Sequence, residues 1–209
     1  MEALLNLLNS EAGQQIIKGI SQETNQNEDT TGKVLSMAMP VMMGAMKRNV
    51  SSPEGAMGLL SNLTGKHNGG IMDTLDVFFG GGVDDSDKEE GNGLLDSILG
   101  GSKDNVANMI SGKSGIDVGD VMNILKVAAP IIMGYLGKEN AKAGNGSAEG
   151  LQTLLEGFTG KGKEQGMLES LLDGDNDGSV LDDVAGMLLN NSGKSGGLGG
   201  LLGGFLGKK

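Results

Sequence analysis

Three aspartates near the end of the chain stand at alternate positions and are followed by a glycine. Asp173, Asp175 and Asp177 precede Gly178, and Ser179 comes next. Carboxylates at positions 1, 3 and 5 of a tight loop can converge on one hard cation, and glycine at position 6 permits the sharp turn. In an EF-hand loop the backbone carbonyl at position 7, here that of Ser179, is a further ligand. The spacing therefore predicts one calcium ion bound per chain.

The closing ligand of this loop departs from the usual pattern. An EF-hand loop ends with a bidentate acid at position 12, where this chain has Val184. Asp182 and Asp183, at positions 10 and 11, are the acids that could close a shortened loop. An alternative is a surface turn in which Asp177 or Ser179 caps a helix over 180–190, and the two interpretations are compatible. The predicted ligand set is Asp173, Asp175, Asp177, Ser179, Asp182 and Asp183.

The single histidine, His67, lies in a glycine-rich turn, where we expect it to be exposed. Catalysis by a lone histidine needs a nucleophile or a carboxylate as partner, and no local spacing supplies one. The preceding Thr64-Gly65-Lys66 lacks the rest of a phosphate-binding loop and is typical of a helix end. A carboxylate-dependent hydrolase is an alternative function, but we expect no enzyme, no catalytic residues and no organic cofactor.

The C-terminal tail at 191–209 combines glycines with apolar residues at helical spacing. Each glycine opposes helix formation by about 1 kcal/mol relative to alanine, so the isolated tail favours disorder in water. We expect the apolar strip to order on an unknown protein partner or on a second copy of the chain. The alternative function is a membrane- or envelope-associated factor that acts through this tail. The strip consists of Leu198, Leu201, Leu202, Phe205 and Leu206.

The charge of the chain excludes one class of partner. The formal net charge is −11 and Arg48 is the only arginine, whereas nucleic-acid binding needs clustered Lys and Arg. Cysteine is absent, which excludes disulfides and thiolate metal sites. The N-terminus lacks the basic region of a secretory signal, and no uninterrupted apolar run approaches the length of a membrane span. We therefore expect a cytoplasmic protein.

Two stretches of the chain match each other in order. Pro40 and Gly44 correspond to Pro130 and Gly134 at an offset of 90. Copies of this length predict the tandem duplication of a small domain. We expect a first helical repeat at 1–82, a flexible acidic linker at 83–93, a second helical repeat with the calcium-type loop at 94–190, and the tail. At an offset of 95, the further matches are Ser52 with Ser147, Leu59-Leu60 with Leu154-Leu155, and Thr64-Gly65-Lys66 with Thr159-Gly160-Lys161.

Apolar residues recur at three- and four-residue steps in both copies. One face of a helix in the second copy is formed by Val121, Ile124, Leu125, Ala128 and Ile132. Apolar residues on its opposite side predict that this helix is buried around most of its girth. Pro130 lies inside the pattern, as Pro40 does in the first copy, and should kink the helix. The sequence therefore predicts an all-α fold, with short helices packed around one longer helix in each copy.

A family resemblance rests on several of these features in their order along the chain. The proline- and glycine-containing core helix, the Thr-Gly-Lys turn, the late acidic loop and the Gly-Leu tail resemble the bacterial domain of unknown function 937, which is related to the YidB-like proteins. The resemblance covers most of the chain and implies a bacterial source and an irregular all-α array. It carries no established catalytic residues. The sequence thus indicates a non-catalytic interaction or structural protein, and its duplication is where it departs from simpler members.

Overall fold

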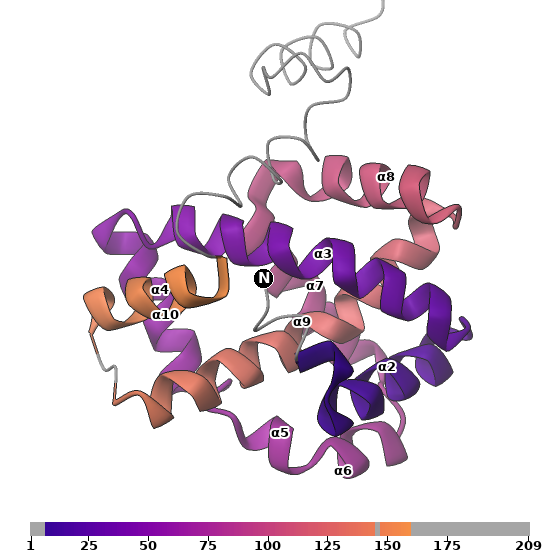
Figure 1. Ribbon diagram of the computed structural model, residues 1–209, viewed down its shortest axis with the longest axis horizontal. Coiled ribbons are helices and arrows are strands. Elements are labelled where there is room, and N and C mark those ends of the chain that lie inside the picture. Colours follow the sequence, from indigo (N-terminus) through magenta and orange to yellow (C-terminus); the bar gives the residue numbers. More distant parts are fainter. Residues whose placement is uncertain (1–6, 145–146, 160–209) are drawn as a thin grey trace, which may run out of the picture. The chain divides into compact units, whose positions relative to one another are not determined.

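Every regular element in the part of the chain that the structure describes is helical. The computed structural model describes residues 7–144 and 147–159 (Figure 1). Helices α2 to α10 and one 3₁₀ turn make up this part, which confirms the all-α prediction for it. The helices are α2 (Glu11–Thr24), α3 (Glu28–Asn49), α4 (Pro53–Thr64), α5 (Gly70–Asp73), α6 (Leu75–Gly80), α7 (Asp85–Leu99), α8 (Lys103–Ser114), α9 (Val118–Lys142) and α10 (Ala148–Thr159), and the 3₁₀ turn is Gly100–Ser102.

Two of the shorter helices begin at a serine that caps the first turn. Ser52 accepts a hydrogen bond from the backbone N–H of Gly55 at the start of α4, and Ser147 accepts one from Gly150 at the start of α10. Each such cap satisfies a backbone donor that the helix leaves free, and is worth about 1 kcal/mol. Gly65 follows the last residue of α4 and donates its N–H to the carbonyl of Ser61. Local signals therefore set the starts of both helices and the end of α4.

Helix α9 is the central element of the described part. It contacts α2, α3, α4, α5, α7, α8 and α10, and Figure 1 shows it running between α3 and α5. As predicted, it is buried around most of its girth, because positions on both sides of the predicted face are inaccessible. Examples are Leu125, Val127, Ile131 and Met133. By length and apolar composition alone α9 could cross a membrane, but 61% of its most apolar stretch is buried inside the fold.

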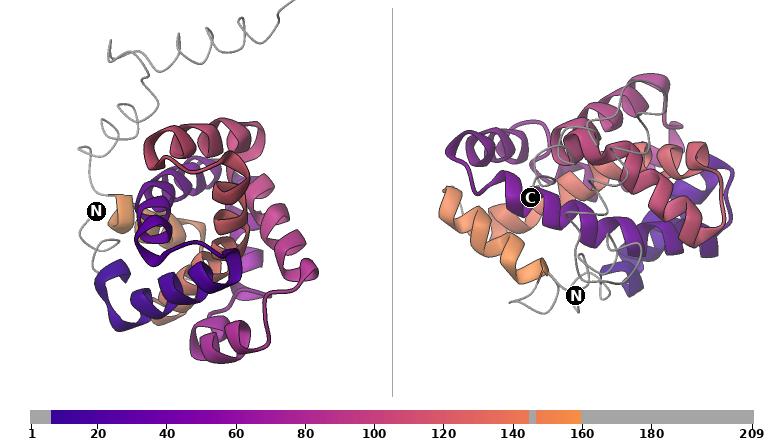
Figure 2. Two further views of the ribbon diagram at one scale, coloured as in Figure 1. Left: turned by 90° about the vertical axis from the view of Figure 1, so that its right-hand side faces the viewer. Right: turned by 90° about the horizontal axis from the view of Figure 1, so that it is seen from above.

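The two halves of the chain interleave instead of folding apart. Helix α4 of the first half packs on α9 of the second, and α10 of the second half packs on α3 and α4 of the first (Figure 2). Helices α2 and α8 likewise each contact both α3 and α9. The side-chain amide of Asn49 at the end of α3 donates to the carbonyls of Ser97 and Ile98 in α7, at 3.1 and 3.2 Å. The described residues accordingly belong to one compact unit.

The prediction of a flexible linker at 83–93 is wrong, because most of this segment belongs to α7. Val83 is buried, and its N–H donates to the carboxylate of Glu23 at 3.0 Å. Asp84 and Asp87 then form a reciprocal capping box at the start of the helix. The acidic residues that suggested a solvated linker therefore delimit and start a helix, and the rest of α7 packs along α9.

A glycine and a proline allow α7 and α9 to approach closely. Pro130 lies inside α9, as predicted, and has no N–H to donate to the carbonyl of Lys126. Gly91 of α7 is buried against this carbonyl, and a Cβ added to Gly91 would lie only 1.8 Å from the Lys126 oxygen. The Cα–H of Gly91 thus faces an acceptor that lacks its usual helical partner, as in a weak C–H···O contact. Glycine is required at position 91 by packing, although it lowers helix propensity.

Candidate functional site

The predicted calcium ligands lie outside the described residues. Asp173, Asp175, Asp177, Ser179, Asp182 and Asp183 all fall beyond residue 159, as does the Gly-Leu tail. Within 7–144 and 147–159, no three His, Asp or Glu side chains are grouped so that they could hold a metal ion. The titratable groups that do converge in the described part surround His67.

His67 is buried, so the prediction of an exposed surface histidine is wrong. Its side chain is only 7% exposed. The backbone N–H of His67 donates to the backbone carbonyl of Asn62 at 3.0 Å. The turn that carries it is pressed onto α9, since a Cβ added to Gly137 would lie 1.8 Å from the His67 carbonyl oxygen. The glycine-rich sequence of the turn suggested exposure, but a second glycine 70 residues later provides the room for burial.

Glu90 of α7 faces both basic residues of this turn. The Nε2 atom of His67 lies 3.3 Å from Oε1 of Glu90, and Nζ of Lys66 lies 2.5 Å from Oε2. Lys66 is largely exposed, whereas Glu90 is 25% exposed. One carboxylate therefore connects the turn after α4 to α7. Sequence reasoning missed Glu90 because it lay in the expected linker, and no local spacing relates it to His67.

Burial dominates the protonation behaviour of His67. Desolvation lowers the pKa of the imidazole, the nearby Glu90 carboxylate raises it, and Lys66 lowers it further, with a net shift below the ordinary value. A neutral imidazole beside a carboxylate could serve as a general base. No hydroxyl among the described hydrogen bonds is paired with His67 as a nucleophile would be, and the ring is enclosed. The arrangement is that of a polar contact holding three segments together.

We predict that His67 makes the fold less stable in mild acid. With a folded-state pKa below the ordinary value of about 6.5, the unfolded chain binds a proton first as pH falls, so the free energy of unfolding decreases from about pH 7 downward. Chemical denaturation of wild type and His67→Gln at pH 7.5 and 5.5 measures this. The variant should lose less stability than wild type over the interval. Equal losses in both proteins would contradict the assignment.

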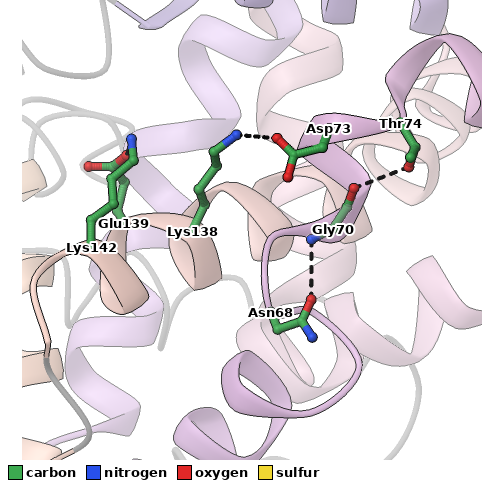
Figure 3. A network of polar contacts seen from close by, with 7 residues as sticks. All are labelled: Asn68, Gly70, Asp73, Thr74, Lys138, Glu139 and Lys142. Carbon is green, nitrogen blue, oxygen red and sulfur yellow. Dashed lines mark hydrogen bonds and ion pairs between the residues drawn. The ribbon is translucent and has the colours of Figure 1, made fainter.

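A second polar network fixes α5 on α9 (Figure 3). Lys138 of α9 reaches Asp73 at the end of α5, with 2.5 Å between Nζ and Oδ1. Asn68 accepts from the N–H of Gly70 at 3.2 Å, and the hydroxyl of Thr74 donates to the carbonyl of Gly70 at 3.1 Å. These bonds hold both ends of a helix only four residues long. The contacts of His67 and of α5 thus form one continuous seam along the second half of α9.

A small apolar pocket lies between α2, α3 and α9, away from these polar groups. Its one titratable lining group is the phenol of Tyr135, whose pKa is raised by burial and by the Glu139 carboxylate. The ring of Tyr135 packs edge-on against Phe158, with 5.8 Å between centroids. No acid or nucleophile accompanies it in the lining, so the pocket offers packing and no chemistry. Its lining comprises Leu7, Leu8, Gly13, Ile16, Leu35, Met39, Ala128, Ile131, Ile132 and Tyr135.

Comparison with known proteins identifies a family and nothing closer. The family described as "Bacterial protein of unknown function (DUF937)" matches residues 6–139. The matched range includes the segment expected as a linker, together with α2 to α8 and most of α9. No curated protein and no solved structure matches the chain.

Proposed function

We propose that this chain, which belongs to the DUF937 family of bacterial proteins of unknown function, is a non-catalytic interaction or structural protein that binds one calcium ion. The observation that carries the proposal is the spacing of Asp173, Asp175 and Asp177 before Gly178. Acids at alternate positions repel one another unless a cation offsets their charge, and hard oxygen ligands of this kind suit calcium. The ion would have a structural role.

The proposed ligands fall into two groups, those in the first part of the loop and the acid that closes it. Asp173, Asp175 and Asp177 supply side-chain oxygens, and Ser179 supplies its carbonyl. Asp182 or Asp183 closes the site, in place of the bidentate acid expected at position 12. A closing acid this early gives a shortened loop. We therefore expect weaker binding than in an EF-hand with its full ligand set.

Replacing one of the first three ligands should weaken calcium binding. Asp175→Asn keeps the size of the side chain but removes the charge, so we expect calcium affinity to fall at least about tenfold, as loss of 1.4 kcal/mol requires. Glu89→Gln is the matched control, because it removes one negative charge from an exposed position of α7. Calorimetric titration of calcium into both variants compares them. Unchanged affinity in Asp175→Asn, or an equal loss in Glu89→Gln, would contradict the proposed ligand set.

We also propose that the fold is a tandem duplication whose two copies exchange helices. Helices α3 and α9 each contain an internal proline, at positions 40 and 130. Helices α4 and α10 each have 12 residues and follow a capping serine. The contacts follow the same correspondence, since α4 packs on α9 while α10 packs on α3. These correspondences support two copies in which α3 and α4 of the first are equivalent to α9 and α10 of the second, and each copy's shorter helix packs on the longer helix of the other.

The partner of such a protein is proposed to be another protein or a second copy, in the cytoplasm. The strip formed by Leu198, Leu201, Leu202, Phe205 and Leu206 supports an apolar contact, and the net charge of −11 disfavours nucleic acid. A membrane surface is the competing partner for the same strip. Co-sedimentation with liposomes of the full chain and of a chain ending at Asn190 separates these possibilities. Equal soluble fractions would reject the membrane surface, and loss of membrane binding on truncation would favour lipid over a protein partner.

A further inference from the structure

The way α5 is seated on α9 defines a pattern of three contacts. Ile71 packs on Gly134, because a Cβ added to this glycine would lie 2.1 Å from Cγ2 of Ile71 and 3.6 Å from its Cβ. One turn farther along α9, Lys138 pairs with Asp73. Leu75, two residues beyond Asp73, is buried. On α9 the contact residues are a glycine and a cation four positions apart. On the docked segment they are an apolar residue, which packs on the glycine, and an acid two positions later, which pairs with the cation.

The docked segment has a counterpart later in the chain. Residues 70–75 read Gly-Ile-Met-Asp-Thr-Leu, and residues 166–171 read Gly-Met-Leu-Glu-Ser-Leu, at an offset of 96. All six positions keep their chemical class: glycine, two apolar residues, an acid, a hydroxyl and leucine. The first segment begins six residues after α4 ends at Thr64, and the second begins seven residues after α10 ends at Thr159. Both segments thus follow corresponding helices at nearly the same distance.

The seat on α9 has a counterpart on α3. Gly44 and Arg48 stand at the positions of Gly134 and Lys138, at an offset of 90. Gly44 is half-buried and Arg48 is exposed. None of the ion pairs within the described residues includes Arg48. Helix α10 packs on α3, as α4 packs on α9. Segment 166–171 therefore follows a helix that packs on α3, just as segment 70–75 follows a helix that packs on α9.

A paired difference between the two seats supports the correspondence. On α9, Gly137 makes room for the carbonyl of His67 in the turn that leads to α5. On α3 the equivalent of Gly137 is Lys47, and in the second turn the equivalent of His67 is Gly162. In the first pair the glycine is on the helix, and in the second pair it is in the turn. Each pair of turn and helix residues therefore contains one glycine. A close approach of turn and helix therefore remains possible in both copies.

We propose that the surface of α3 around Gly44 and Arg48 is a docking site for the chain's own segment 166–171. In the proposed arrangement, Met167 takes the place of Ile71 on Gly44, Glu169 pairs with Arg48 as Asp73 pairs with Lys138, and Leu171 corresponds to the buried Leu75. The predicted calcium loop starts at Asp173, two residues after Leu171. Docking therefore anchors one end of that loop to the helical unit. The inference does not depend on calcium binding, and its test is made in the presence of a chelator.

Engineered disulfides test the docking, because the chain contains no cysteine of its own. Ile71→Cys with Gly134→Cys is the reference pair, since the two Cβ positions are 3.6 Å apart, within the range that a disulfide requires. Gly44→Cys with Met167→Cys is the test pair. Leu168→Cys with Gly44→Cys, and Met72→Cys with Gly134→Cys, shift each register by one residue. Oxidation is followed by mobility in non-reducing gels and by mass.

The test pair should close as an intramolecular disulfide nearly as fast as the reference pair, and at least about tenfold faster than its one-residue shift, because docking raises the effective thiol concentration. Closure of the test pair no faster than its shifted control would overturn the proposal.

A measurement without substitutions at Gly44 covers the case in which that variant does not fold. Arg48→Glu should reduce amide-exchange protection at 167–171 about two- to fivefold, as an ion pair of this kind predicts, and Arg48→Glu with Glu169→Arg should restore it. No protection at 167–171 in the unmodified chain would also overturn it.

Discussion

Replacing Gly91 by alanine is expected to lower the free energy of unfolding by about 2 to 3 kcal/mol, the cost of overpacking a close helix contact. The new Cβ would meet the carbonyl oxygen of Lys126 at 1.8 Å and its carbon at 2.7 Å. Both atoms belong to the backbone of α9, so no side-chain rotation relieves the overlap. Helices α7 and α9 must move apart along their shared contact. The gain in helix propensity, about 1 kcal/mol, is too small to compensate.

Gly93 provides the matched control on the same helix. It is exposed, and a Cβ added there would meet no atom within 4 Å. Gly93→Ala should therefore raise stability by up to about 1 kcal/mol through helix propensity and a less flexible unfolded chain. Urea denaturation of both variants measures the two changes with opposite signs. If Gly91→Ala were neutral or stabilising, α7 would not pack on α9 as described.

Replacing Leu155 by alanine is expected to lower the free energy of unfolding of the whole described unit by about 3 kcal/mol, as for other large-to-small core changes. Its side chain is fully buried in α10, which contacts α3 and α4 of the first half as well as α9. The cavity therefore lies between segments about 100 residues apart in the chain. Because the two halves form one unit, the amides of α3 should lose protection from hydrogen exchange together with those of α10.

Gln152→Ala, on the exposed side of α10, is the control for this prediction. Its side chain is exposed, so the change should stay within about 0.5 kcal/mol. Loss of protection confined to α10 in Leu155→Ala, with α3 unaffected, would mean that the halves unfold separately. That outcome would favour two independent repeats over the interleaved arrangement.

Local signals in the sequence were sufficient to predict the all-α fold, the two proline-containing helices and the starts of α4 and α10. The three- and four-residue spacing of apolar residues around Leu125 predicts the buried helix α9, and the serines at 52 and 147 predict two helix starts. These features act within one turn of helix, so they can be recognised without knowing the fold. The internal positions of Pro40 and Pro130 follow from the same periodicity.

Contacts between distant segments could not be predicted in this way. Residues 83–93 combine acids with glycines, and nothing nearby indicates that Gly91 faces the carbonyl that Pro130 leaves without a donor. The burial of His67 depends on Gly137, and its partner Glu90 lies on another helix. In both cases a glycine chosen for close packing has the same local appearance as a glycine in a flexible turn. The ligands of the predicted calcium site lie beyond the described residues and stay a prediction.

Calcium titration of the unmodified chain tests the central proposal most directly. After treatment with a chelator and its removal, calorimetry should show saturable binding of one ion per chain, with Kd between about 10⁻⁵ and 10⁻³ M for a loop without the usual closing acid. The melting temperature should rise with calcium concentration, since the ion binds the folded chain preferentially. The absence of binding heat up to millimolar calcium, together with an unchanged melting temperature, would contradict the proposal.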